Sequence, residues 1–129
     1  MISPRRISRN EDGSTAVEFA FTAPIFMALL FGIVECALVL WTQFGLQYGV
    51  EAAARCATVD STTCGTASQI ASYAASKALG LSLPASTFTA STASCGNLVQ
   101  ANYAYSFLTQ FFGTPTVTLT AQSCFPKSS

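Results

Sequence analysis

Histidine is absent from this chain of 129 residues, and only 9% of its side chains are charged. Histidine is the commonest acid–base group near neutral pH and the commonest metal ligand, so its absence excludes a Ser-His or Cys-His nucleophile. After the apolar N-terminal segment, the acidic residues are only Glu51 and Asp60, which argues against a catalytic carboxylate pair. We therefore expect no enzyme, no cofactor and no metal site.

Basic residues are also scarce and are concentrated at the N-terminus. Of the six Lys and Arg residues, Arg5, Arg6 and Arg9 lie at the start, and residues 10–54 contain none. No basic patch large enough for nucleic acid exists beyond them. Soluble domains carry about a quarter charged residues, so this composition predicts that part of the chain lies in lipid. The length allows one small domain besides that part.

The long apolar run that follows predicts a transmembrane helix. Residues 19–34 carry no charge, and the run resumes after Glu35 as far as Trp41. As a helix, residues 19–41 would extend about 35 Å, enough to cross a hydrocarbon core of about 30 Å. We place the span at about residues 17–41, with Trp41 at the interface. Because the arginines precede the span, the N-terminus is expected in the cytoplasm and residues 61–129 outside the inner membrane.

Two other kinds of N-terminal signal fit this segment less well. A cleaved secretory signal has a short apolar core and a small-residue cleavage site, whereas this run is longer and no such site follows it. A lipoprotein signal would use Cys36, but Glu35 does not suit the small residue that such processing requires.

Glu18 lies at the entrance to the apolar run, where a carboxylate costs about 2.5–3.5 kcal/mol on insertion scales. It is the fifth residue after Gly13, behind a short basic leader of residues 1–13. This spacing resembles the type IV prepilin signal, in which a peptidase cuts after the glycine. Cleavage would free an amino group on Ser14, which could pair with Glu18 of a neighbouring subunit. The simpler alternative is a glutamate that snorkels to the interface without a special role.

The wider sequence resembles a known family. The stretch from Gly13 to Glu35, with Val17-Glu18-Phe19 and Gly32-Ile33-Val34-Glu35, is similar to the N-terminal region of TadE-like pseudopilins of the tight-adherence (Tad/Flp) pilus system. Residues 47–55, 103–109 and 117–121 also resemble that family. The resemblance implies a minor pilin-like component in pilus assembly. Phe19 stands where the major pilin has tyrosine, which favours a pseudopilin.

Partners and location follow from the same resemblance. It implies processing by a prepilin peptidase, contacts with other pilins and pseudopilins and with the Tad inner-membrane assembly proteins, and possible incorporation into a surface pilus. The alternative function is a membrane-anchored adhesin or binding module that is not cleaved at Gly13.

The helix is expected to continue beyond the membrane, over residues 14–60. Small residues recur every four positions along it, and such stripes allow close helix approach. The members are Ala16, Ala20, Pro24, Ala28, Gly32 and Cys36, and then Gly45, Gly49, Ala53 and Ala57. Glu35 is a second carboxylate in the apolar run, and two roles for it stay open. It either snorkels outward or contacts a partner subunit within the membrane.

Residues 61–129 predict a small α+β domain, so that the whole chain is α+β and pilin-like. Residues 66–79 show helical periodicity, with Gly80 as the stop. Residues 99–107 and 117–122 alternate apolar and polar side chains, as half-buried strands do, and residues 87–92 could add a third strand. An antiparallel sheet packed on the helices is expected.

Four cysteines lie beyond the membrane span and allow three disulfide pairings. They are Cys56, Cys64, Cys95 and Cys124. Bridging Cys56 to Cys64 would close a short loop, and bridging Cys95 to Cys124 would tie two strands if the register placed Tyr103 opposite Thr116. A metal site has no Cys-x-x-Cys pair and no histidine to support it. Cys36 in the apolar run is expected to be an inert thiol.

Overall fold

The computed structural model describes residues 11–109, 113 and 115–127. Two units are distinguished by their internal contacts, residues 1–34 and residues 35–129, and one long helix, α1 (Glu11–Val59), contributes to both. The remaining elements, α2 (Ala67–Lys77), a short 3₁₀ helix (Ala85–Thr87), β1 (Phe88–Ala93), β2 (Gly96–Ser106) and β3 (Thr116–Phe125), belong to the second unit. The predicted α+β class is confirmed.

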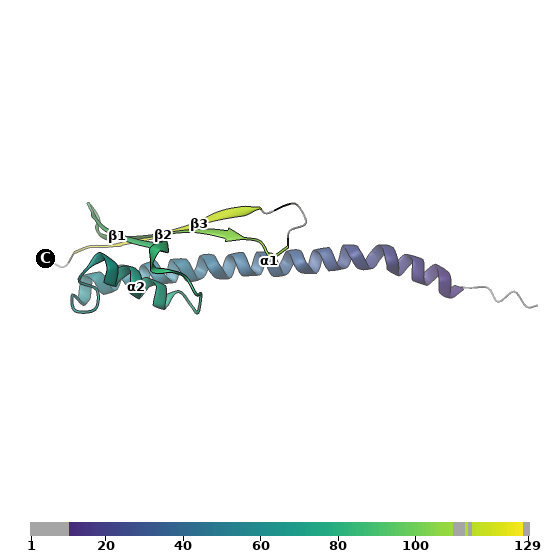
Figure 1. Ribbon diagram of the computed structural model, residues 1–129, viewed down its shortest axis with the longest axis horizontal. Helices are drawn as coiled ribbons and strands as arrows, with labels where there is room; N and C mark the ends of the chain where they lie inside the picture. Colours follow the sequence, from purple (N-terminus) through teal and green to yellow (C-terminus); the bar gives the residue numbers. More distant parts are fainter. Residues whose placement is uncertain (1–10, 110–112, 114, 128–129) are drawn as a thin grey trace, which may run out of the picture. The chain divides into compact units, whose positions relative to one another are not determined.

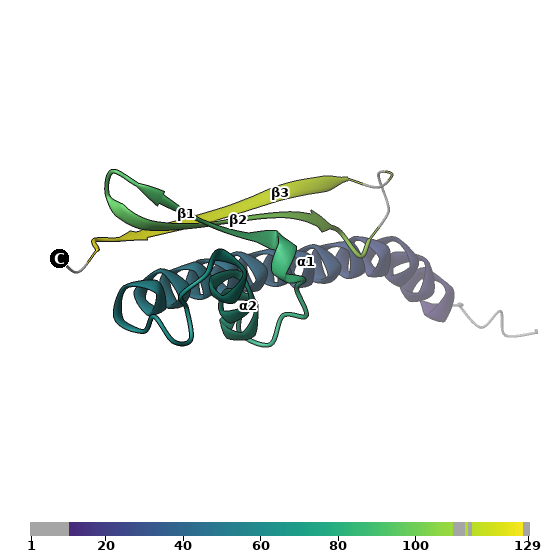
Figure 2. The same ribbon diagram turned by 60° about the vertical axis from the view of Figure 1, so that its left-hand side comes forward.

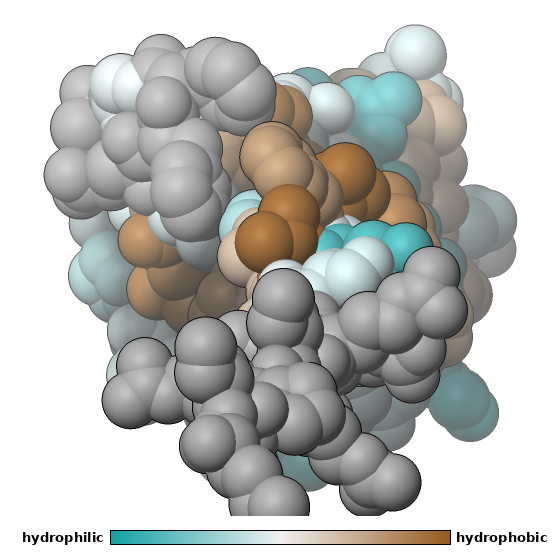
Figure 3. All heavy atoms as spheres, turned by 90° about the vertical axis from the view of Figure 1, so that its right-hand side faces the viewer, coloured by the Kyte–Doolittle hydropathy of each residue, from teal (hydrophilic) through white to brown (hydrophobic). Residues whose placement is uncertain are grey.

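In the first unit, α1 exposes its large apolar side chains in all directions. Phe19, Phe21 and Ile33 are 71%, 74% and 67% exposed, and Pro24 does not end the helix. Figure 3 shows hydrophobic residues, coloured brown, on the surface that faces the viewer. Water is a poor solvent for such a surface, and lipid is a good one. In the described part of the chain, α1 is the single helix long and apolar enough to cross a membrane.

In the second unit, the other half of α1 is the base on which the outer domain is built. The sheet lies along this half of α1, and α2 packs beside the same helix near β1 (Figures 1 and 2). Leu46, Val50 and Ala53 of α1 are fully buried against this cover. Alanines of α2 and one face of the sheet complete the core: Ala71, Ala74, Ala78, Phe88, Val99, Ala101, Tyr105, Leu119 and Ala121.

Close packing of α2 on α1 depends on two glycines of the second small-residue stripe. A Cβ at Gly49 would lie 2.8 Å from the carbonyl oxygen of Ala74, and one at Gly45 would lie 3.0 Å from that of Ala78. Both distances are too short for a side chain, so the missing Cβ atoms allow the backbones to approach. This part of the stripe therefore serves contacts within the chain.

Helix α2 begins one residue inside the predicted range and has a complete N-terminal cap. The Thr66 hydroxyl accepts from the Gln69 backbone N–H, and the Gln69 side chain accepts in return from the Thr66 N–H at 3.1 Å. This capping box satisfies two N–H groups that the helix leaves free. The C-terminal end of α2 differs from the prediction that Gly80 stops the helix. Leu79, at φ 51°, already has a left-handed backbone, and Gly80 follows it at φ 78°.

The sheet has the order β1-β2-β3 with both pairs antiparallel. The expected register between β2 and β3 is wrong by three positions, since Tyr103 lies opposite Leu119 rather than Thr116. The expected alternation is correct for Val99, Ala101 and Leu119, which face the core. Val117 stays 41% exposed, because alternation predicts the face of a strand but not how far the helix covers it.

Two disulfides join Cys56 to Cys64 and Cys95 to Cys124. The first closes the loop between α1 and α2, and the second fastens the β1–β2 turn to the end of β3. Cys95 precedes β2, while Cys124 pairs in the ladder with Leu98. The cysteines therefore bridge from a turn and are not opposite residues of the ladder, which explains the error in the expected register.

Candidate functional site

The predicted processing site lies in the first turns of α1. Gly13 and Ser14 are both exposed, and an added Cβ at Gly13 would meet nothing within 4 Å. The Gly13–Ser14 bond lies in the first described turn of α1, which is described from Glu11.

Glu18 and Phe19 project from the next turn and are open to the surroundings. Phe19 is 71% exposed, and Glu18 is also exposed. The only hydrogen bond to Glu18 outside the helix ladder among the described residues comes from the Thr22 hydroxyl, at 2.9 Å, and it is accepted by the backbone carbonyl oxygen. The carboxylate therefore has no hydrogen-bonding or ionic partner within the described part of the chain.

Glu35 has the opposite environment, although it lies on the same helix. Its side chain is 6% exposed, and both carboxylate oxygens have partners from the end of β2. The Thr109 backbone N–H donates to Oε1 at 2.7 Å, and the Tyr105 hydroxyl lies 3.5 Å from Oε2. Glu35 thus fixes residues 105–109 to α1 and does not point into open space.

Tyr105 is the buried member of this cluster. Burial and then the negative charge of Glu35 raise the pKa of the Tyr105 hydroxyl, because both oppose formation of a phenolate. The ring also packs edge-on against Phe107, with ring centroids 5.5 Å apart. A tyrosine hydroxyl that donates to a carboxylate is a structural arrangement, and it ties the end of β2 to α1.

Gln43 and Gln47 form a second link between α1 and the sheet that the sequence did not reveal. The Gln43 side-chain amide donates to the Thr120 carbonyl oxygen at 2.8 Å, and that of Gln47 lies 3.5 Å from the Gln122 carbonyl oxygen. The two glutamines are four positions apart on α1, and their acceptors are two positions apart on β3, so the side chains reach successive carbonyl groups on one side of this edge strand. These contacts occupy carbonyl groups that an edge otherwise leaves free.

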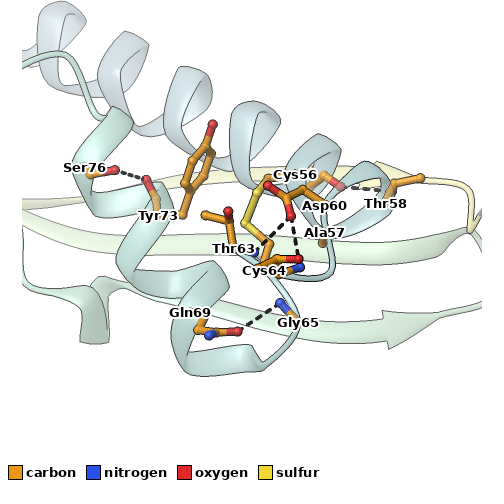
Figure 4. The surroundings of a disulfide bond; sticks show 12 residues. Cys56, Ala57, Thr58, Asp60, Thr63, Cys64, Gly65, Gln69, Tyr73 and Ser76 are labelled. Atoms are coloured by element: carbon orange, nitrogen blue, oxygen red, sulfur yellow. Dashed lines mark hydrogen bonds between the residues drawn. A yellow bond between two sulfur atoms is a disulfide. The ribbon is translucent and has the colours of Figure 1, made fainter.

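The first disulfide lies beside a shallow depression of about 550 Å³, which Tyr48, Arg55, Asp60 and Tyr73 help to line. Figure 4 shows Asp60 folded back onto the loop, where it accepts from the Thr63 backbone N–H at 3.1 Å. Hydrogen bonds from Thr63 lower the pKa of Asp60. The Asp60 carboxylate is therefore engaged by the backbone of its own loop.

The sequence-predicted residues fall into separate places. Gly13, Ser14, Glu18 and Phe19 follow one another on the exposed start of α1, whereas Glu35 is buried in the second unit. Cys36 is an exposed free thiol. Among residues 11–109, 113 and 115–127, no three His, Cys, Asp or Glu side chains come together as metal ligands.

One apolar helix that fits a single-pass membrane anchor is followed by a small α+β domain with two disulfides. Residues 13–55 match the family model described as TadE-like protein, which covers about a third of the chain. Over these residues the chain is similar to TadE-like proteins, which are pilin-like proteins associated with the Tad pilus. This family is structural and not enzymatic. No curated protein and no solved structure matches the chain.

Proposed function

We propose that the chain is a minor pseudopilin in assembly of the Tad pilus and that a prepilin peptidase cuts it after Gly13. The observation that carries this proposal is Glu18. Its carboxylate stands on the exposed start of an apolar helix, without a partner among the described residues. A lone charge at membrane depth costs about 2.5–3.5 kcal/mol, so such residues usually have a functional partner.

The partner that fits is the amino group freed on Ser14 of a neighbouring subunit. An ammonium group and a carboxylate form a charge-assisted hydrogen bond, which is stronger where water is excluded. The cost of placing Glu18 in the membrane is then offset only in the assembly, so the pair favours assembled subunits over single ones. The protein itself performs no catalysis in this scheme.

The direction of insertion completes the proposal. Arg5, Arg6 and Arg9 precede the apolar segment, and the positive-inside rule then keeps the N-terminus in the cytoplasm, where the peptidase acts. The disulfide-tied domain is exported across the inner membrane into an oxidising compartment, which suits two disulfides. Its partners are the peptidase, other pilins and pseudopilins, the Tad inner-membrane assembly proteins and lipid.

The role of Glu18 in assembly is tested by substituting its carboxylate and measuring piliation. Glu18→Gln keeps the size of the side chain and removes its charge, and Glu51→Gln is the matched control, since Glu51 is also exposed on α1 and accepts a bond from Gln47. We expect the Glu18 variant to lose piliation while the Glu51 variant keeps it. Glu35→Gln is measured in the same piliation assay to test an assembly role for that residue. Full piliation by Glu18→Gln would contradict the assembly role of Glu18.

The second candidate function is a membrane-anchored adhesin or binding module. The open depression beside Tyr48 and Tyr73 is the feature that favours it, because aromatic side chains commonly line ligand sites. Such a module would reach the surface with residues 1–13 still attached. The N-terminal mass of the membrane-extracted protein distinguishes the two functions.

A further inference from the structure

Leu108 is an apolar side chain that the fold leaves uncovered. It is 75% exposed, the highest value among the exposed large hydrophobic residues described. Its neighbours on both sides are held in place, since Phe107 packs edge-on against Tyr105 and the Thr109 N–H is bonded to Glu35. The exposure of Leu108 is therefore built into a fixed piece of backbone.

The position of Leu108 follows from its attachment to Glu35. The Thr109 N–H lies 2.7 Å from Glu35 Oε1, and consecutive Cα atoms are about 3.8 Å apart, so Leu108 lies within a few ångströms of the helix at this level. Glu35 is joined covalently to Val34, which ends the unit with the exposed apolar helix. Leu108 is thus held close to Glu35, the residue of the second unit that follows the apolar helix in the chain.

The level of the membrane can be bracketed from the same helix. Residues 13–34 extend about 33 Å, which matches a hydrocarbon core of about 30 Å and puts Glu35 at its outer limit. If the span instead reaches Trp41, as the sequence predicts, Glu35 lies inside the membrane. In either case Glu35 lies at or inside the outer limit of the hydrocarbon core.

The polar groups around Leu108 are compatible with that location. Glu35 is 6% exposed, and its two oxygens face Thr109 and Tyr105, so its carboxylate does not face lipid. Residues 105–109 carry no charged side chain. On the neighbouring strand, Val117 is 41% exposed opposite Tyr105.

We propose that the segment around Leu108, which follows β2, inserts into the membrane interface and gives the outer domain a lipid contact of its own. Glu35 is the residue that positions the contact, because it holds residues 105–109 at the membrane level. The occupant of this surface is lipid, because Glu35, to which the segment is bonded, adjoins the end of the apolar span in the chain. The proposal depends on the membrane span and is independent of the role in pilus assembly.

Fluorescence quenching by lipid in reconstituted vesicles tests the proposal on the full chain. Cys36→Ser removes the free thiol and leaves both disulfides intact. Leu108→Cys in this background is labelled with an environment-sensitive dye and reconstituted with phosphatidylcholine–phosphatidylglycerol lipids that carry a quencher near the acyl carbonyl groups. Val59→Cys, at the far end of α1 and 73% exposed, is the matched control, and Phe26→Cys reports the span.

We expect the dye at Leu108 to be quenched several-fold more strongly than the dye at Val59 and to emit at shorter wavelength. Equal, weak quenching at both positions with strong quenching at Phe26 would overturn the proposal. Protection of Leu108 from aqueous iodide without quenching by lipid would also overturn it, because a protein contact then covers the residue. Weak quenching at Phe26 would contradict the membrane span itself.

Discussion

Replacing Glu35 tests how the outer domain is held to α1. Glu35→Ala removes the acceptor of the Thr109 N–H, a partly buried backbone group that has no other partner in the hydrogen-bond network described. Glu35→Gln keeps a carbonyl oxygen for that N–H but removes the negative charge. Tyr105→Phe removes only the second bond, at 3.5 Å. The three changes should therefore differ in size.

The expected magnitudes follow from the geometry. A short hydrogen bond to a charged group contributes about 1.5–3 kcal/mol, so Glu35→Ala should lower the free energy of unfolding by about 2–3 kcal/mol. Glu35→Gln replaces a charged bond by a neutral one and should cost about 1 kcal/mol. Tyr105→Phe should cost less than about 1 kcal/mol, because 3.5 Å is beyond the usual range of an O–H···O bond.

Thermal unfolding of the full chain in detergent micelles, followed by near-UV circular dichroism, measures these differences. For a domain of this size, 1 kcal/mol shifts Tm by about 4–8 °C, so Glu35→Ala should lower Tm by roughly 10–20 °C and Glu35→Gln by about 4–8 °C. Glu51→Gln, on an exposed part of the same helix, is the control and should change Tm little. A larger loss from Tyr105→Phe than from Glu35→Ala would refute the assignment of Thr109 as the main partner.

Two further predictions concern Tyr105 and Gly49. The pKa of Tyr105 is raised in the folded state, so its contribution to stability is complete below the ordinary tyrosine pKa and is lost as the pH rises through the raised value. In an absorbance titration at 295 nm, one of the four tyrosines should therefore ionise at higher pH than the others. Tyr105→Phe should remove that late component. Gly49→Ala should lower the stability of the outer domain by about 1–3 kcal/mol in denaturant unfolding, despite the better helix propensity of alanine, because its Cβ meets the Ala74 backbone. Gly32→Ala, where a Cβ meets nothing within 4 Å, should leave that stability unchanged, and equal losses from both would contradict the packing argument.

Local features of the sequence were sufficient to predict most of the elements. The apolar run, the helical periodicity of residues 66–79 and the alternation in residues 99–107 each depend on neighbours in the chain. The structure contains the corresponding two helices and strand. The disulfide between Cys56 and Cys64 also follows from a short separation of eight residues.

Contacts between distant residues were not predictable in the same way. Glu35 and Thr109 are 74 positions apart, and nothing in either local sequence indicates that they meet. The register of β2 and β3 is set partly by Gly96, where a Cβ would collide with the Phe125 carbonyl oxygen. Such a close approach depends on the three-dimensional arrangement of β2 and β3 and is not visible in the local sequence. The pairing of Cys95 with Cys124 could therefore be correct, although the expected register of the two strands was wrong.

The sequence predicted the surroundings of some residues of the candidate site better than those of others. Glu18 and Phe19 are exposed on α1, as a role in contacts with other subunits would require. For Glu35 the sequence left outward snorkelling and a partner contact open, and the structure gives its carboxylate two partners within the chain. A contact of Glu35 with another subunit stays a prediction.

The mass of the N-terminus tests the central claim most directly. The full chain is extracted from membranes of cells with and without the prepilin peptidase, beside Gly13→Val, a change at a position where an added Cβ meets nothing within 4 Å. We predict a mature protein beginning at Ser14 in cells with the peptidase, and the full precursor both in cells without it and for Gly13→Val. An intact Met1 in piliated cells that contain the peptidase would contradict the account.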